Sequence, residues 1–416
     1  MATISPSMDF ADPRTARAPA VAASTRDPRL DVFRGIAMFI ILVAHIPNNT
    51  WANWIPARFG FSDATEIFVF CSGMASAIAF GGVFAKKGWL TGTARVAFRC
   101  WQVYWAHIAL FFFTAAAMAA IDLWWPGDGS YVAALNLQHF FKNPEQQIVG
   151  LFTLTYVPNY FDILPMYLGV LALMPVMIAL VRIHLVVGIA ASLALWAAAN
   201  IGTVHFPAEP WTDREWFFNP FGWQLLFFTG FAFMRGWIPA PPVNRTLIWI
   251  CAAFLVLSAP FGSWKVLTWI DAASPALGDW IKGAWRWMDY QDVSERFSLR
   301  DKTDFGLLRY LHFLSLAYLA WAAAGTGGAR LRELASGAAG AAPRFLLAII
   351  TKVGQQSLAV FVFSMAVAQI LGFVLDQLGR NAENHILVNI WGFALIAATA
   401  YIAAWFKSQP WRSKGR

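Results

Sequence analysis

Long apolar segments recur along the whole 416-residue chain, and no other feature constrains its fold as strongly. A helix needs about 20 predominantly apolar residues to cross a bilayer. In lipid every backbone polar group must be paired internally, which favours helices. The sequence therefore predicts an all-α polytopic membrane protein with about ten transmembrane helices. We expect them at residues 33–49, 63–85, 97–121, 162–181, 184–204, 221–236, 246–263, 306–324, 346–377 and 386–406.

Composition supports this class and excludes others. The chain is 58% hydrophobic and only 13% charged, with 22 Trp and 36 Phe residues suited to the lipid bilayer and its interfaces. The net charge of +8 comes without a basic run or a nucleic-acid motif, so we expect no nucleic-acid partner. The three cysteines lie in apolar stretches without metal-ligand spacing, so we expect no disulfide framework and no metal.

Charge distribution predicts the orientation of the chain. Residues 1–28 are predicted to form a disordered cytoplasmic tail, 29–406 the transmembrane domain and 407–416 a second cytoplasmic tail. The first of these lacks the long apolar core of a cleaved signal peptide. With the N-terminus inside, 20 of the 31 lysine and arginine residues fall on the cytoplasmic side. The positive-inside rule then places both termini in the cytoplasm.

The stretch "RLDVFRGIAMFIILVAH" keeps Arg34 and His45 in an otherwise apolar helix. Eleven helical steps separate them by roughly 16 Å and bring them within about 20° of one face. Ionisable groups inside a bilayer are expensive and indicate function by default. A structural role remains open for each, since an arginine can anchor topology and a histidine can be a satisfied core residue.

Polar residues near other helix ends form two layers. We expect an outer layer near His45 from five helix ends, and an inner basic layer from Arg34 and the third helix. The outer layer contains Asp63, Glu66, Asp162, Tyr167, Asn219, Gln224, Arg309 and His312, and the inner layer adds Arg95 and Arg99, one turn apart. The alternatives are purely structural roles: helix N-caps for Asp63 and Asp162, topology anchors for the arginines and core packing for His312.

The two layers suggest a chemistry. Guanidinium groups pair well with phosphates, so the inner layer suits a phosphorylated cytosolic ligand such as acyl-CoA. An outer histidine suits general-base activation of a hydroxyl, with a carboxylate as its partner. Between the two candidates we favour Glu66 over Asp63, because Glu66 lies a turn deeper. The pantetheine arm of the donor would span the distance from Arg34 to His45.

These residues resemble a known family. "RLDVFRGIAMFIILVAH", with its Arg-x10-His pattern, and "EIFVFCSG" resemble the membrane acyltransferase-3 superfamily. The closer resemblance is to the OpgC family, which succinylates osmoregulated periplasmic glucans. It is carried by "RDPRLDVFRG", "HIPNN", "FGFSDATEIFVF", "DILPMY", "WFFNPFGWQLLF", "RYLHFL" and "GQQSLAVF", spread from residue 26 to about 361.

The resemblance implies a bacterial inner-membrane enzyme with no permanently bound cofactor. Acyl-CoA, in this family succinyl-CoA, would be the co-substrate and a periplasmic glucan the acceptor. His45 matches the family's essential histidine, Arg34 the paired arginine, and Arg95 and Arg99 the basic pair of the third helix. This chain has Arg-x3-Arg there, whereas the wider superfamily often has Arg-x2-Arg.

We therefore predict an O-acyltransferase acting on a periplasmic glucan. His45, Glu66 and Asp63 would be catalytic, and Arg34, Arg95 and Arg99 would bind the donor. The remaining outer residues, Asp162, Tyr167, Asn219, Gln224, Arg309 and His312, would bind the acceptor. Two alternatives stay open: an acyltransferase acting on lipopolysaccharide or another surface glycan, and a small-molecule transporter.

Overall fold

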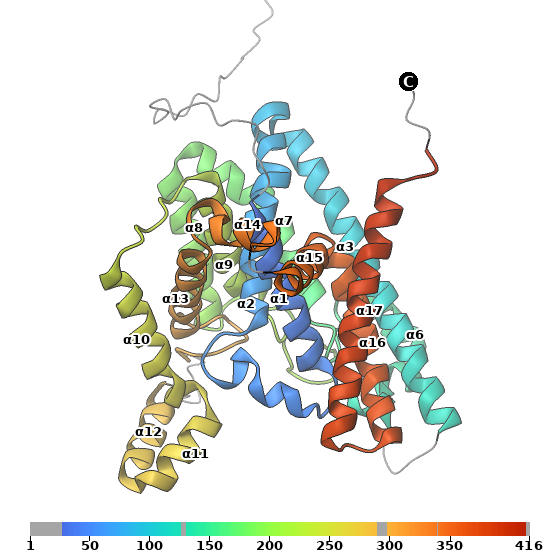
Figure 1. The fold of residues 1–416 in the computed structure, drawn as a ribbon. Helices are drawn as coiled ribbons and strands as arrows, with labels where there is room; N and C mark the ends of the chain where they lie inside the picture. The colour runs from blue at the N-terminus through green and yellow to red at the C-terminus, as the bar shows by residue number, and fades with distance from the viewer. Residues whose placement is uncertain (1–26, 126–129, 289–297, 339, 413–416) are drawn as a thin grey trace, which may run out of the picture.

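The computed structural model describes residues 27–125, 130–288, 298–338 and 340–412 (Figure 1). Within these residues the chain forms helices and no β-strand, and its one β-type pairing is an isolated bridge between Pro207 and Glu215. The all-α prediction is therefore confirmed. Most of the predicted N-terminal tail lies outside the described residues.

The helices differ widely in length. In chain order they are α1 Pro28–His45, α2 Ala64–Ser76, α3 Gly82–Trp124, α4 Tyr131–Ala134, α5 Gln138–Lys142, α6 Pro144–Thr153, α7 Ile163–Ile183, α8 Leu185–Asn200, α9 Pro220–Arg235, α10 Arg245–Gly262, α11 Trp264–Ala273, α12 Pro275–Met288, α13 Leu307–Ala324, α14 Ala329–Ser336, α15 Ala341–Gln355, α16 Ser357–Leu378 and α17 Ala382–Ser408. A π-helical turn, Ala77–Gly81, joins α2 to α3.

Six helical segments in the described part of the chain are long and apolar enough to cross a bilayer. They are Ala64–Trp124, Ile163–Ile183, Arg245–Gly262, Leu307–Ala324, Ser357–Leu378 and Ala382–Ser408. The predicted count of about ten is thus not confirmed. α8 and α9 have 16 residues each, about 24 Å against a hydrocarbon thickness of about 30 Å. The predicted spans 63–85 and 97–121 run on as one helical segment, which turns at Gly88, where φ is 83°.

The prediction of a single helix over 346–377 is wrong. The structure divides this stretch into α15 and α16 at Gln356, whose φ of −109° and ψ of 30° are not helical. α15 packs closely against α1, because two glycines face the partner backbone. A Cβ at Gly354 would lie 1.8 Å from the Asp31 carbonyl oxygen, and one at Gly35 would lie 2.0 Å from that of Ile350.

The buried core lies between α1, α2, α7, α9 and α16. Its members include Leu42 of α1, Val69 of α2 and Phe227 of α9, each fully buried. Figure 1 shows α1 and α2 near the middle of the molecule and α10, α11 and α12 at its edge. On α10 the side chains of Trp249 and Val256 are 73% and 71% exposed, as expected of a helix surface that faces lipid.

Candidate active site

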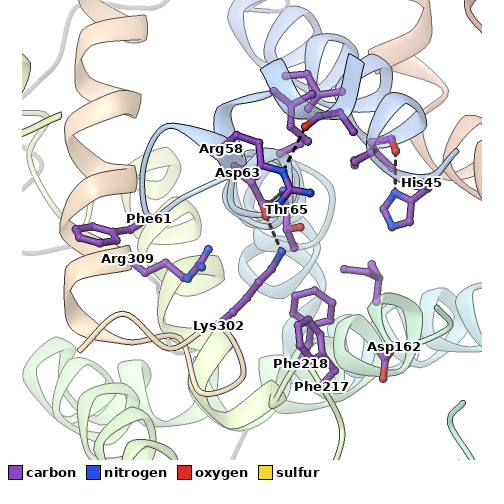
Figure 2. Close-up of a pocket in the computed structure, with 18 of the residues that line it drawn as sticks. His45, Arg58, Phe61, Asp63, Thr65, Asp162, Phe217, Phe218, Lys302 and Arg309 are labelled. Atoms are coloured by element: carbon purple, nitrogen blue, oxygen red, sulfur yellow. Dashed lines mark hydrogen bonds and ion pairs between the residues drawn. The ribbon is translucent and has the colours of Figure 1, made fainter. Parts of the chain in front are cut away.

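A cavity of about 450 Å³ opens where α1 ends and where α2, α7 and α13 begin. We call it the His45 cavity. Its polar and charged lining comprises His45, Arg58, Asp63, Thr65, Tyr160, Asp162, Lys302 and Arg309. Figure 2 shows His45, Asp63 and Lys302, which come from segments far apart in the sequence, around one space. Of the residues predicted for the outer layer, it brings together His45, Asp63, Asp162 and Arg309.

His45 is the last residue of α1, and its ring is oriented by the backbone of its own helix. Nδ1 lies 2.7 Å from the Ile41 carbonyl oxygen (Figure 2). A carbonyl oxygen only accepts, so Nδ1 carries the proton and donates it. In the neutral ring this leaves the lone pair on Nε2, and no described side chain hydrogen-bonds that atom. His45 therefore has the tautomer that a general base in the cavity needs.

Tyr160 holds the other side of the His45 ring and was not predicted from the sequence. The two rings meet edge to face, with centroids 5.5 Å apart. The Tyr160 hydroxyl donates to the carbonyl of Met365 in α16. Burial raises the pKa of Tyr160, so the hydroxyl stays protonated. Its φ of 89° is unusual for a bulky residue and is held by these contacts.

Asp63 and Glu66 form a capping box at the start of α2. Asp63 accepts a hydrogen bond from the Thr65 amide, and Glu66 Oε2 accepts one from the Asp63 amide at 2.7 Å. This arrangement satisfies two of the unpaired N–H groups at the helix N-terminus. It also turns the Glu66 carboxylate back toward the helix start and into the protein interior.

Glu66 is the predicted partner of His45, but the structure pairs it with Arg309. Arg309 Nη1 lies 2.6 Å from Glu66 Oε1, and the Glu66 side chain is fully buried. A buried carboxylate requires such a cation. Lys302 Nζ likewise lies 2.6 Å from Asp63 Oδ2. Among the described residues, no carboxylate lies within hydrogen-bond distance of either His45 nitrogen.

Three residues predicted to bind the acceptor line neither cavity described in this section. Asn219 caps α9 and donates to the Val204 carbonyl and to Asp304, both at 2.7 Å. Gln224 joins α9 to α8 through two hydrogen bonds with Ser192. Each is a buried amide whose partners are protein groups, so the structure gives both a packing role.

His312 is the third of these residues. Its Nδ1 lies 2.7 Å from the Ser62 hydroxyl, and its ring meets Phe61 at a centroid distance of 5.7 Å. His312 therefore supports the 60–63 segment that carries Asp63, rather than entering the cavity. Tyr167, predicted for the same layer, lines a different cavity.

That second cavity, of about 520 Å³, is the Arg34 cavity. It is lined by all three arginines predicted for the inner layer, Arg34, Arg95 and Arg99. Lys407 of α17 adds a fourth cation that the sequence analysis missed. No carboxylate is among the residues that line it. Four cations in a lining that contains no carboxylate make a site for an anionic ligand.

Neutral polar groups complete the Arg34 cavity. Ser72, Ser76 and Tyr167 contribute hydroxyls, and Gln355, Gln356 and Ser357 come from the break between α15 and α16. An Arg34 Nη2 hydrogen donates to the Ser357 hydroxyl, whereas the buried Nε has no partner among the described residues. The helix break therefore places polar residues beside Arg34 in the lining of this cavity.

Lys302 and Arg58 are two further cations that the sequence analysis missed. Lys302 belongs to the segment "DKTDFG", seven residues before Arg309. The charged residues of that segment were the only sequence feature that could have indicated a site there. Arg58 donates to the Ala52 carbonyl at 3.4 Å and forms no ion pair among the described residues. Both side chains line the His45 cavity.

Arg214 and Glu209, which lie outside the membrane-spanning helices, stabilise the segment that carries Tyr160 and Asp162. Arg214 donates to the Val157 carbonyl at 2.7 Å and to Glu209 at 3.0 Å. Burial of Glu209 would raise its pKa, but hydrogen bonds from Thr212 and Arg214 outweigh this effect and hold the pKa below its usual range. Glu209 is therefore ionised at neutral pH and keeps Arg214 in place.

No group of three His, Cys, Asp or Glu side chains in the described part of the chain could hold a metal ion. Residues 26–408 match a family model described as OpgC protein. No curated protein and no solved structure matches the chain.

Proposed function

The chain belongs to the OpgC family, and from this premise we propose that it transfers an acyl group from cytosolic acyl-CoA to a hydroxyl of a periplasmic glucan. Family membership alone indicates an OpgC-like, glucan-modifying acyltransferase. The donor, the acyl group and the details of the acceptor are our proposal. The observation that carries it is the pair of cavities joined by α1, one built for an anion and one containing a correctly oriented imidazole.

The Arg34 cavity is the proposed donor site. Its four cations suit the phosphates of coenzyme A, since guanidinium groups bind phosphate through paired N–H donors. The serine and glutamine side chains around Arg34 offer further hydrogen bonds to the polar pantetheine arm. Arg34 sits at the inner end of the stripe that leads to His45, so a thin donor aligned with α1 reaches toward the second cavity.

His45 is the proposed general base. Its Nε2 takes the proton of the acceptor hydroxyl as the hydroxyl oxygen attacks the thioester carbonyl carbon. The new C–O bond forms, the C–S bond breaks, and the coenzyme A thiolate leaves and takes up a proton. The hydrogen bond from Nδ1 to the Ile41 carbonyl stabilises the imidazolium that forms, so this role does not require a carboxylate partner.

A dicarboxylic acyl group such as succinyl is the proposed cargo. Arg58, Lys302 and Arg309 place three cations on the wall of the His45 cavity. Asp63 and Glu66 pair with two of them, and Arg58 has no ion pair among the described residues. Arg58 can therefore pair with an acyl group that carries its own carboxylate, or with the oxyanion that develops during transfer.

Mass spectrometry of periplasmic glucans tests the proposal. A deletion strain should lose the acyl substituents, a plasmid copy of the wild-type gene should restore them, and a His45→Ala copy should not. Glucans that keep their substituents in the deletion strain would contradict the proposed acceptor. Loss of acyl groups from lipopolysaccharide instead would favour the surface-glycan alternative.

A further inference from the structure

The His45 cavity and the Arg34 cavity share three helices but no lining residue. On α2 the lining changes from one cavity to the other between Thr65 and Ser72, and on α7 between Ile163 and Tyr167. Seven and four helical steps correspond to about 10 Å and 6 Å of rise. The two cavities are thus separated by one to two helical turns of packed protein.

Phe68 lies in this partition. It is in the middle of the α2 stretch that separates the cavities, and its side chain is 4% exposed. On a helix its side chain points within about 60° of Thr65 and about 40° of Ser72, so it projects from the same face as both. That face lines the two cavities above and below it.

Aromatic partners close the partition around Phe68. Its ring stacks on Phe361 of α16, with centroids 5.5 Å apart and planes 20° from parallel. Its edge meets Tyr167 of α7 at 6.2 Å, and the Tyr167 ring itself lines the Arg34 cavity. Rings from three helices therefore meet where a donor that reaches from one cavity to the other must pass.

Resting on the proposed function, we propose that Phe68 is a specificity-determining residue. The acyl thioester reaches His45 only when the Phe68 ring leaves its stack on Phe361. The size of this side chain therefore decides which acyl groups pass and whether they meet water in the absence of an acceptor. Room for the displaced ring exists on the donor side, where the same face of α2 carries the small residues Ser72, Ala75 and Ser76.

A closed partition protects the donor. A thioester in contact with water in the His45 cavity is open to hydrolysis, in which water oxygen attacks the carbonyl carbon and the C–S bond breaks. The products are the free carboxylic acid and the coenzyme A thiol, and the acyl group is lost. Exclusion of water until the acceptor is bound prevents this side reaction.

The test measures release of coenzyme A thiol by the full-length, detergent-purified protein, with and without glucan. Removal of the ring in Phe68→Ala should raise acceptor-independent release about tenfold without changing acyl-CoA affinity. The bulkier Phe68→Trp should slow glucan acylation about tenfold, again at unchanged affinity. Phe68→Leu, which keeps much of the apolar volume, covers the case in which the alanine variant does not fold.

Phe231→Ala is the matched control. Phe231 is a 1% exposed residue of α9 that packs on Trp237 and lines neither cavity, so its loss should leave both rates unchanged. Folded Phe68→Leu and Phe68→Trp variants with wild-type rates in both assays would overturn the inference. A wild-type protein that binds no acyl-CoA and acylates no glucan would overturn the proposed function, and this inference with it.

Discussion

His45 offers a free Nε2 because the carbonyl of its own helix holds the proton on Nδ1. Removal of a positioned general base usually costs about 10²–10⁴-fold in rate. We therefore expect His45→Ala to lower acyl transfer by at least about 10²-fold while acyl-CoA still binds. The measurement is transfer from labelled acyl-CoA to glucan at matched amounts of folded protein.

His107→Ala is the control for this prediction, because His107 is buried in α3 and lines neither cavity. It should affect turnover less than His45→Ala. If the His45→Ala protein keeps even about a tenth of wild-type turnover, His45 is not the base. Asp162, in the same cavity, then becomes the next candidate.

Arg99 is one of the four cations that line the Arg34 cavity, so its loss should weaken binding of the proposed acyl-CoA donor. The loss of one charged hydrogen bond costs about 1.5–3 kcal/mol, roughly ten- to a hundredfold in affinity. We expect Arg99→Ala to raise the Kd for acyl-CoA by this factor, measured by calorimetry on purified protein. Arg99→Lys should recover only part of the affinity, because it keeps the charge and loses the planar fork.

Arg245 supplies the matched control, since this exposed arginine begins α10 and lines neither cavity. Arg245→Ala should bind acyl-CoA as tightly as wild type. An Arg99→Ala variant with wild-type affinity would reduce Arg99 to a topology anchor.

At the scale of single residues, the depth of a side chain in the membrane could be predicted from the sequence. Its hydrogen-bond and ion-pair partners could not. His45, Asp63, Asp162 and Arg309 share a cavity because each lies at a helix end, and hydropathy locates helix ends. The sequence predicts Glu66 as the carboxylate partner of His45. In the structure Glu66 is the third residue of a capped helix, so its carboxylate turns away from His45 and forms an ion pair with Arg309 of α13. Tyr160 could not be predicted, since its left-handed backbone depends on tertiary contacts.

At the scale of secondary-structure elements, the junction of α15 and α16 matters most for the proposed donor site. Gly354 lies against the backbone of α1 near Asp31, and Ser357 follows three residues later and accepts a hydrogen bond from Arg34. The close approach of the two helices thus sets the position of the polar break. A side chain at residue 354 must push α15 away from α1.

We expect Gly354→Ala to lower thermal stability and weaken acyl-CoA binding together. The added Cβ would lie 1.8 Å from the Asp31 carbonyl oxygen, and overpacking of this kind costs on the order of 1–3 kcal/mol. Gly283→Ala in α12 is the control, because a Cβ there meets nothing within 4 Å. Equal melting temperatures for the two variants, measured in the same detergent, would contradict the close contact.

Hydropathy could not predict this junction. Gln355, Gln356 and Ser357 are three polar residues inside a long apolar window, and averaging over a helix-length window hides them. The predicted gap between the spans 63–85 and 97–121 likewise falls inside α3, which in fact continues through the turn at Gly88. Apolar periodicity therefore predicted the helical class and failed at the places where helices break or continue.

At the scale of the whole molecule, the two cavities lie at different levels along α1. Arg34, eleven residues before His45, lines one of them, and His45 lines the other. Lys407, near the end of α17, also lines the Arg34 cavity, so the last helix ends at that level. If acyl-CoA enters from the cytosol, the C-terminus must lie on the cytosolic side.

Orientation is the prediction that unites charge, cavities and chemistry. Placing both termini in the cytoplasm puts 20 of the 31 lysine and arginine residues inside. It also gives the Arg34 cavity access to the proposed donor, cytosolic acyl-CoA, and it places His45 toward the periplasm, where the proposed acceptor is. Alkaline phosphatase, which is active only in the periplasm, should therefore be inactive when fused after Arg416 and active when inserted after Ala273, between α11 and α12.

A cytoplasm-active reporter at the same two positions should give the opposite result, which excludes differences in expression. An active phosphatase after Arg416 would reverse the chain in the membrane and place the four cations of the donor site on the side that has no acyl-CoA.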